Sequence, residues 1–139
     1  MPPINLMAVL VAAVAAFIIG FLFHGPVLGK TWMKLANIHP TGNEKFSGMI
    51  PQMLWNLLSN FVTAYVLAAV YLYISSSPLS GGPGIWTGVG VATWLWAGFL
   101  VTSSSIEVIW MKRSVKLWLF ECFSSFVVMA AMGAIIASW

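Results

Sequence analysis

Charged side chains are confined to two short windows of this chain. The windows hold Lys30, Lys34, Glu44 and Lys45, and then Glu107, Lys112, Arg113, Lys116 and Glu121. From Phe46 to Ile106 the chain contains no Asp, Glu, Lys or Arg. A water-soluble domain needs charge on its surface, whereas a chain in lipid must avoid it, because one charge at the bilayer centre costs about 2.5–3.5 kcal/mol on insertion scales. The pattern therefore predicts an integral membrane protein.

The composition agrees with this class and excludes several functions. Hydrophobic residues make up 60% of the 139 residues and charged residues 6%, against about 25% charged residues in ordinary globular chains. All six basic residues flank apolar segments, so the net charge of +3 indicates topology and no nucleic-acid partner. His24, His39 and Cys122 form no ligand cluster for a metal. Because neither a phosphate-binding glycine loop nor a Ser/His/Asp set occurs, we expect a protein that is not an enzyme.

Four apolar segments have the length of a membrane-spanning helix, which needs about 20 residues. They cover residues 4–23, 49–74, 85–106 and 117–139. Backbone groups in lipid must be hydrogen-bonded within the segment, so each segment is expected to be a helix. Serine, glycine and proline fill the connection 75–84 and favour a turn there. The sequence predicts one all-α domain, an integral membrane four-helix bundle.

The longest connection, 24–48, carries an amphipathic pattern. One helical face holds apolar residues, namely Leu28, Trp32, Leu35 and Ala36. Lys30 and Lys34 lie on another face. The pattern predicts a short helix in the lipid headgroup region that ends before His39-Pro40.

The basic residues also predict an orientation. Connections 24–48 and 107–116 hold all six Lys and Arg residues, while the termini and the connection 75–84 hold none. The positive-inside rule then places those two connections in the cytoplasm and both termini outside. We expect a multi-pass protein of a prokaryotic inner membrane, with the lipid bilayer as its first partner.

Small residues recur at helical spacing and predict close helix packing. Lipid tails are as apolar as leucine, so helices in a membrane associate through close contacts between small side chains. The predicted contact residues are Ala12, Ala16, Gly20, Gly84, Gly88 and Gly133. These faces can meet within one chain or between chains, which leaves open a homo-oligomer or a subunit of a larger membrane complex.

A polar stripe on the second segment marks the candidate site. Gln52, Asn56 and Asn60 follow one another at four-residue spacing. Glu107 ends the third segment and Glu121 begins the fourth, in the same half of the predicted bundle. If these residues converge, they line a polar cavity that is open to the cytoplasm and suits a cation or a small polar ligand. In the alternative interpretation, the amides hydrogen-bond neighbouring helices and each glutamate reaches the interface to pair with a nearby lysine.

His24 supports a separate hypothesis about a cofactor. Gly20 precedes it by one helical turn and leaves room for a planar ring such as haem or a chlorin. The competing interpretation is an interfacial polar cap at the end of the first helix.

Several short stretches resemble a known family. They are residues 20–35, which contain Gly25-Pro26 and Gly29-Lys30-Thr31-Trp32-Met33, and residues 64–68, 116–120 and 132–139. These stretches resemble small prokaryotic four-helix membrane proteins grouped as domain of unknown function 1761. The chain departs from that pattern at His24, where an aromatic residue is usual, and at Glu121, where a neutral polar residue is usual. The resemblance implies a four-helix fold and no particular activity.

Two functional hypotheses follow from these patterns. The first is a structural or accessory membrane component, homo-oligomeric through its small-residue faces. The alternative is a channel or carrier for a small cation or polar solute, which would use the predicted polar cavity.

Overall fold

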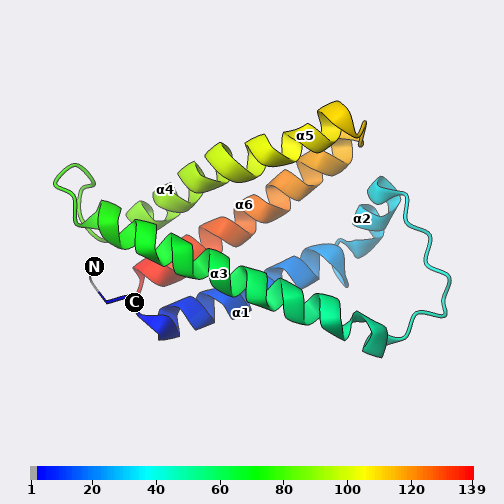
Figure 1. The fold of residues 1–139 in the computed structure, drawn as a ribbon, viewed down its shortest axis with the longest axis horizontal. Helices are drawn as coiled ribbons and strands as arrows, with labels where there is room; N and C mark the ends of the chain where they lie inside the picture. Colours follow the sequence, from blue (N-terminus) through cyan, green and yellow to red (C-terminus); the bar gives the residue numbers. More distant parts are fainter. Residues whose placement is uncertain (1–2) are drawn as a thin grey trace.

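The computed structural model describes residues 3–139, and these residues form helices without any strand (Figure 1). The elements are α1 (Leu6–His24), α2 (Gly29–Ala36), the 3-10 turn η1 (Phe46–Met49), α3 (Ile50–Ser75), α4 (Ile85–Leu95), the π-helical η2 (Trp96–Val101), α5 (Thr102–Trp110) and α6 (Val115–Ala137). Helix α4, η2 and α5 form one continuous span. Four helical stretches are long and apolar enough to cross a membrane, which confirms the predicted four-helix architecture.

The third span continues beyond residue 106 and ends at Trp110. The hydroxyl groups in this stretch donate to backbone carbonyls one turn back. Each hydroxyl thus has a hydrogen-bond acceptor within its own helix, and the helix continues. Thr102 donates to the carbonyl of Gly98 at 2.7 Å, and Ser104 donates to that of Leu100 at 2.7 Å. The turn between the third and fourth spans is correspondingly short, because α6 begins at Val115.

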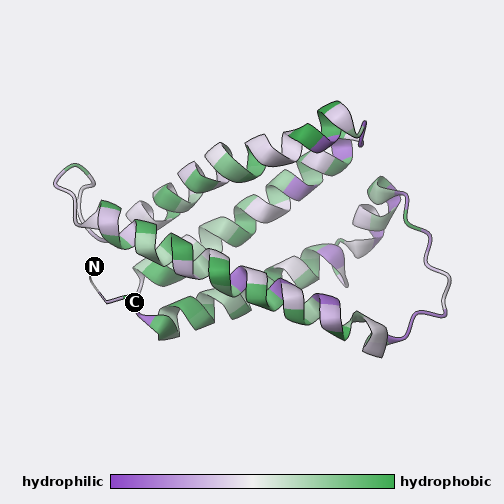
Figure 2. Cartoon of the chain, in the orientation of Figure 1, coloured by the Kyte–Doolittle hydropathy of each residue, from purple (hydrophilic) through white to green (hydrophobic). Residues whose placement is uncertain are grey.

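Helix α6 lies at the centre of the arrangement. It packs along α1 on one side and along α4 on the other, while α3 packs mainly against α1. The start of α1, the C-terminus and the connection 76–84 lie at one end of the bundle, which we call the terminal end (Figure 1). Helix α2, the connection 37–49 and the turn 111–114 lie at the opposite end, which we call the basic end. Hydrophobic residues dominate the length of the spans, and hydrophilic residues gather toward the basic end (Figure 2).

Alanines form much of the buried core. Ala12, Ala13, Ala64 and Ala92 have no exposed surface, and Ala16 is 1% exposed. Side chains this small let helix backbones approach closely, which is the main source of packing energy between helices in lipid. The predicted contacts of Ala12 and Ala16 are therefore made inside a single chain.

Helices α4 and α6 approach each other closely at two glycines. A Cβ atom added to Gly88 would collide with the carbonyl oxygen of Gly133, and one added to Gly133 would collide with that of Gly88. Only glycine at both positions permits this backbone contact. A Cβ at Gly20 or Gly84 would meet nothing within 4 Å, so these two glycines make no such contact within the chain. Association between copies stays a prediction.

The amphipathic helix in the long connection is present as α2. It ends at Asn37, whose backbone is left-handed with φ 56° and whose N–H donates to the Lys34 carbonyl. The N–H of Ile38 donates to the carbonyl of Met33 at 2.9 Å, which completes a helix-ending turn. The helix thus ends before His39-Pro40, as the sequence predicted. It folds back onto the end of α1 and onto α6.

The π-helical segment η2 interrupts the third span at its middle. Trp96, its first residue, donates its indole N–H to the Cys122 carbonyl at 3.1 Å and to the Ser125 hydroxyl at 3.0 Å. Its ring also meets Phe126 edge-on, with ring centroids 5.0 Å apart. A π-helical turn changes the rotational phase of the residues that follow it, and such turns are frequent at functional sites. The segment η2 therefore decides which side of α5 faces α6.

Candidate functional site

An open cavity of about 370 Å³ lies between α1, α3 and α6 in the half of the bundle nearer the basic end. In Figure 1, α3 diverges from α5 and α6 toward that end. The cavity is lined by Ala16, Gly20 and His24 of α1, by Asn56, Asn60 and Thr63 of α3, by Leu100, and by Glu121, Ser124, Ser125, Val128, Met129 and Met132 of α6.

Helix α3 contributes two amides and a hydroxyl to the cavity. The side-chain N–H of Asn60 donates to the side-chain carbonyl of Asn56 at 2.9 Å, which orients both amides. Thr63 donates its hydroxyl to the backbone carbonyl of Ser59 at 2.9 Å, so its oxygen keeps free lone pairs. These three residues offer mainly oxygen acceptors to whatever occupies the cavity.

Helix α6 contributes the one carboxylate in the cavity lining. The only ion pair between side chains of residues 3–139 joins Glu107 and Arg113, so Glu121 has no basic partner there and does not pair with Lys116. Ser124 is 4% exposed, and its hydroxyl makes no hydrogen bond with any residue that the structure describes. The hydroxyl oxygen itself is not enclosed, because the indole nitrogen of Trp32 is the one buried side-chain polar atom without a partner in residues 3–139. The Ser124 hydroxyl is therefore free to contact a molecule in the cavity that it borders.

His24 stands at the basic end of the cavity, as the last residue of α1. Its Nδ1–H donates to the carbonyl of Gly20 at 2.9 Å. The ring meets Trp32 of α2 edge-on at a centroid distance of 5.0 Å and Phe120 of α6 at 6.2 Å. His24 thereby joins α1, α2 and α6 at this end of the bundle.

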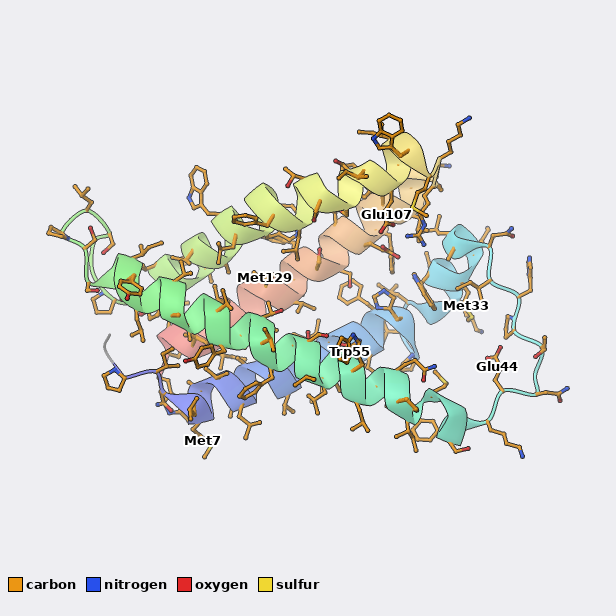
Figure 3. All side chains as sticks on the ribbon, in the orientation of Figure 1. Met7, Met33, Glu44, Trp55, Glu107 and Met129 are labelled. Atoms are coloured by element: carbon orange, nitrogen blue, oxygen red, sulfur yellow. The ribbon has the colours of Figure 1, made fainter. Side chains whose placement is uncertain are left out.

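Two of the predicted site residues lie outside the cavity lining. Figure 3 shows Glu107 at the basic end of α5, well apart from Met129 at mid-helix of α6. Glu107 pairs with Arg113 across the turn, and this hydrogen bond and attraction raise the pKa of the Arg113 guanidinium above its ordinary value. Gln52 lies exposed in the first turn of α3, where its amide can donate to the carbonyls of Gly48 and Met49. The structure thus brings together Asn56, Asn60 and Glu121 from the predicted set.

We expect the Glu107–Arg113 ion pair to matter little for stability. Both side chains are nearly half exposed, at 45% and 42%, and exposed pairs contribute about 0–1 kcal/mol. Glu107→Gln and Arg113→Ala should each change the free energy of unfolding by less than about 1 kcal/mol. Urea titrations of the protein in detergent, with the double variant to complete the cycle, measure this. A coupling energy above about 2 kcal/mol would contradict the assignment of a solvated pair.

The residues that close the cavity were not predicted from the sequence. Met129 and Met132 cap its inner end, and they are 4% and 0% exposed. Met132 continues the helical face of Glu121, Ser125 and Val128. This spacing could have indicated that Met132 lines the same cavity. A methionine in an apolar run does not by itself indicate a cavity wall.

Comparison with known proteins identifies a family for this chain and finds no relative of known activity. No curated protein and no solved structure matches the chain. A family model described as "Protein of unknown function (DUF1761)" matches residues 7–137, which is almost the entire chain. The chain belongs to this family of unknown function, as the resemblance in its short motifs predicted.

Proposed function

We propose that the protein binds a small cation or polar solute in the cavity and carries it across the membrane. In this proposal the protein lies in a prokaryotic inner membrane, with the basic end in the cytoplasm and both termini outside, as the basic connections indicate. The cavity then opens toward the cytoplasm.

The single observation that carries the proposal is the convergence of polar groups from α3 and α6 on one open cavity. Asn56, Asn60 and Thr63 face Glu121 and Ser124 across a space of about 370 Å³. Ligand sites typically enclose about 300–1,000 Å³. Polar groups within membrane spans are costly and mostly mark ion or substrate sites. A helix that serves only as a structural element has no need of a carboxylate and two amides around an open space.

The chemistry of the lining favours a positively charged or hydrogen-bond-donating solute. Glu121 supplies the negative charge, and the amide and hydroxyl oxygens accept hydrogen bonds or coordinate a cation. His24 at the basic end is the one basic side chain in the lining. A neutral solute with several hydroxyl groups would use the same oxygens and the amide donors.

The test is a flux measurement on purified protein in liposomes. Three probes cover the proposed range, namely ⁸⁶Rb⁺, tetraethylammonium and glycerol. We expect uptake of at least one probe to exceed that of empty liposomes. We expect Glu121→Gln to reduce the uptake of a cationic probe about tenfold or more, because a hydrogen bond to a charged group is worth about 1.5–3 kcal/mol.

Glu44→Gln provides the control, because Glu44 is an exposed carboxylate in the connection 37–49 and lies outside the cavity lining. It should leave uptake unchanged. If no probe enters faster than into empty liposomes, or if Glu121→Gln and Asn60→Leu leave uptake intact, the transport proposal fails. A structural or accessory role would then be the better explanation of the bundle.

A further inference from the structure

A second cavity of about 320 Å³ lies at the terminal end of the same three helices. It is bordered by Asn5 and Ala8 near the start of α1, by Tyr71 and Ser75 of α3, and by Ile136 of α6, with Trp139 beyond that helix. Both cavities therefore lie between α1, α3 and α6, at opposite ends.

The two cavities follow one continuous face of each helix. On α3, Asn60 and Thr63 border the first cavity and Tyr71 borders the second, with Leu67 between them at helical spacing. On α6, Val128 and Met132 border the first cavity and Ile136 the second. Since equivalent faces line both spaces, the cavities are aligned along the bundle.

A thin buried layer separates the cavities. Ala12, Ala64 and Met132 have no exposed surface, and Leu67 is 1% exposed. The two linings are four residues apart on α6, from Met132 to Ile136, and eight residues apart on α1, from Ala16 to Ala8. At 1.5 Å per residue the layer is about 6–12 Å thick. Leu67 and Met132 are the largest side chains in the layer and belong to one buried cluster.

We infer that the two cavities are the ends of one transport path for a small organic cation, closed in this structure by Leu67 and Met132. The inference rests on the proposed transport function and specifies its route and its solute class. Methionine is flexible and adapts to different packings, so a layer that contains Met132 can part with modest side-chain movement. The other residues of the layer, Ala12 and Ala64, have small side chains that add little to what must move.

The lining of the path selects an organic cation over an alkali ion. The layer offers only alkyl groups and a thioether, whereas an alkali ion needs several oxygen ligands in place of its water. An alkylated ammonium group has an apolar surface that such a layer accepts. In the second cavity Tyr71 and Trp139 present aromatic rings, which attract alkylated ammonium groups. Each cavity is also far larger than a dehydrated metal ion needs.

The route is tested by thiol accessibility in full-length protein that carries Cys122→Ser, which removes the one native cysteine. Single cysteines are introduced on one helix by Thr63→Cys, Leu67→Cys and Ser75→Cys. The probe is a methanethiosulfonate reagent with a quaternary ammonium group, applied to one side of oriented vesicles at a time. We expect Thr63→Cys to react from the basic side, Ser75→Cys from the terminal side, and Leu67→Cys at least a hundredfold more slowly from either side.

Flux of tetraethylammonium into liposomes tests the closed layer. Met132→Ala shortens the side chain and should raise the uptake rate at least threefold. Met7→Ala is the control, because Met7 is 58% exposed on α1 and borders neither cavity, and it should leave the rate within twofold. The inference is overturned if Ser75→Cys does not react from the terminal side, if Leu67→Cys reacts as fast as Thr63→Cys, or if Met132→Ala leaves uptake unchanged. Uptake of ⁸⁶Rb⁺ or glycerol that depends on Glu121, without uptake of tetraethylammonium, overturns this inference while the proposed function stands.

Discussion

Gly133→Ala is expected to destabilise the folded protein by about 3 kcal/mol or more, because it inserts a methyl group into a backbone-to-backbone contact. The new Cβ would collide with the carbonyl oxygen of Gly88 and would lie 2.9 Å from the Cβ of Ala92. Neither neighbour is the end of a flexible side chain, so α4 and α6 must move apart. Unfolding of the protein in mixed micelles by urea, followed by circular dichroism, measures the loss.

Gly90→Ala is the matched control for this contact. Gly90 also lies on α4, two residues from Gly88, but a Cβ there would meet nothing within 4 Å. This change should be neutral or slightly stabilising, since alanine favours a helix over glycine by up to about 1 kcal/mol. Equal losses for Gly133→Ala and Gly90→Ala would contradict the backbone contact between Gly88 and Gly133 as the cause of the destabilisation.

Trp96→Ala is expected to cost about 3–5 kcal/mol of stability, as large aromatic truncations in packed regions do. The indole links η2 to α6 by two hydrogen bonds and packs edge-on against Phe126. Its removal leaves a void between the third and fourth spans and releases the hydroxyl of Ser125, which borders the first cavity. The same micelle unfolding experiment reports the change.

Trp94→Ala separates this effect from the loss of a tryptophan as such. Trp94 lies two residues earlier on α4 and is 81% exposed on the outside of the bundle. Its replacement should change the unfolding free energy by less than about 1 kcal/mol, because it packs against little of the protein. Trp96→Phe should lie between the two, since it keeps a ring and loses both hydrogen bonds. A loss for Trp94→Ala as large as that for Trp96→Ala would show that η2 is not anchored through the indole.

The four spans could be predicted because the mean hydropathy of a segment depends on its own residues and not on contacts with distant ones. Each apolar segment had to be helical, and only its ends were open. The third span continues four residues beyond the predicted end, to Trp110, and the hydroxyls of Thr102 and Ser104 donate to carbonyls of their own helix. The cap of α2 at Asn37 depends on a left-handed backbone conformation, whereas the sequence indicated only the stop at His39-Pro40.

The candidate site was predictable where it follows one helix. Asn56 and Asn60 face the cavity together because a four-residue spacing fixes their common side. Glu107 and Glu121 have similar sequence surroundings, yet one pairs across the turn and the other borders the cavity. Their different positions depend on the phase of η2 and on the tight turn before α6, which no helical period reveals.

The sequence alone determined that four apolar helices form this protein and where they begin and end to within a few residues, because the transfer of charge and backbone into lipid is too costly for other solutions. The tertiary structure decided which small residues meet, which residues line the two cavities, and that Leu67 and Met132 lie between them. Those features arise from contacts between distant residues, which depend on helix rotation and crossing and not on the composition of any one segment.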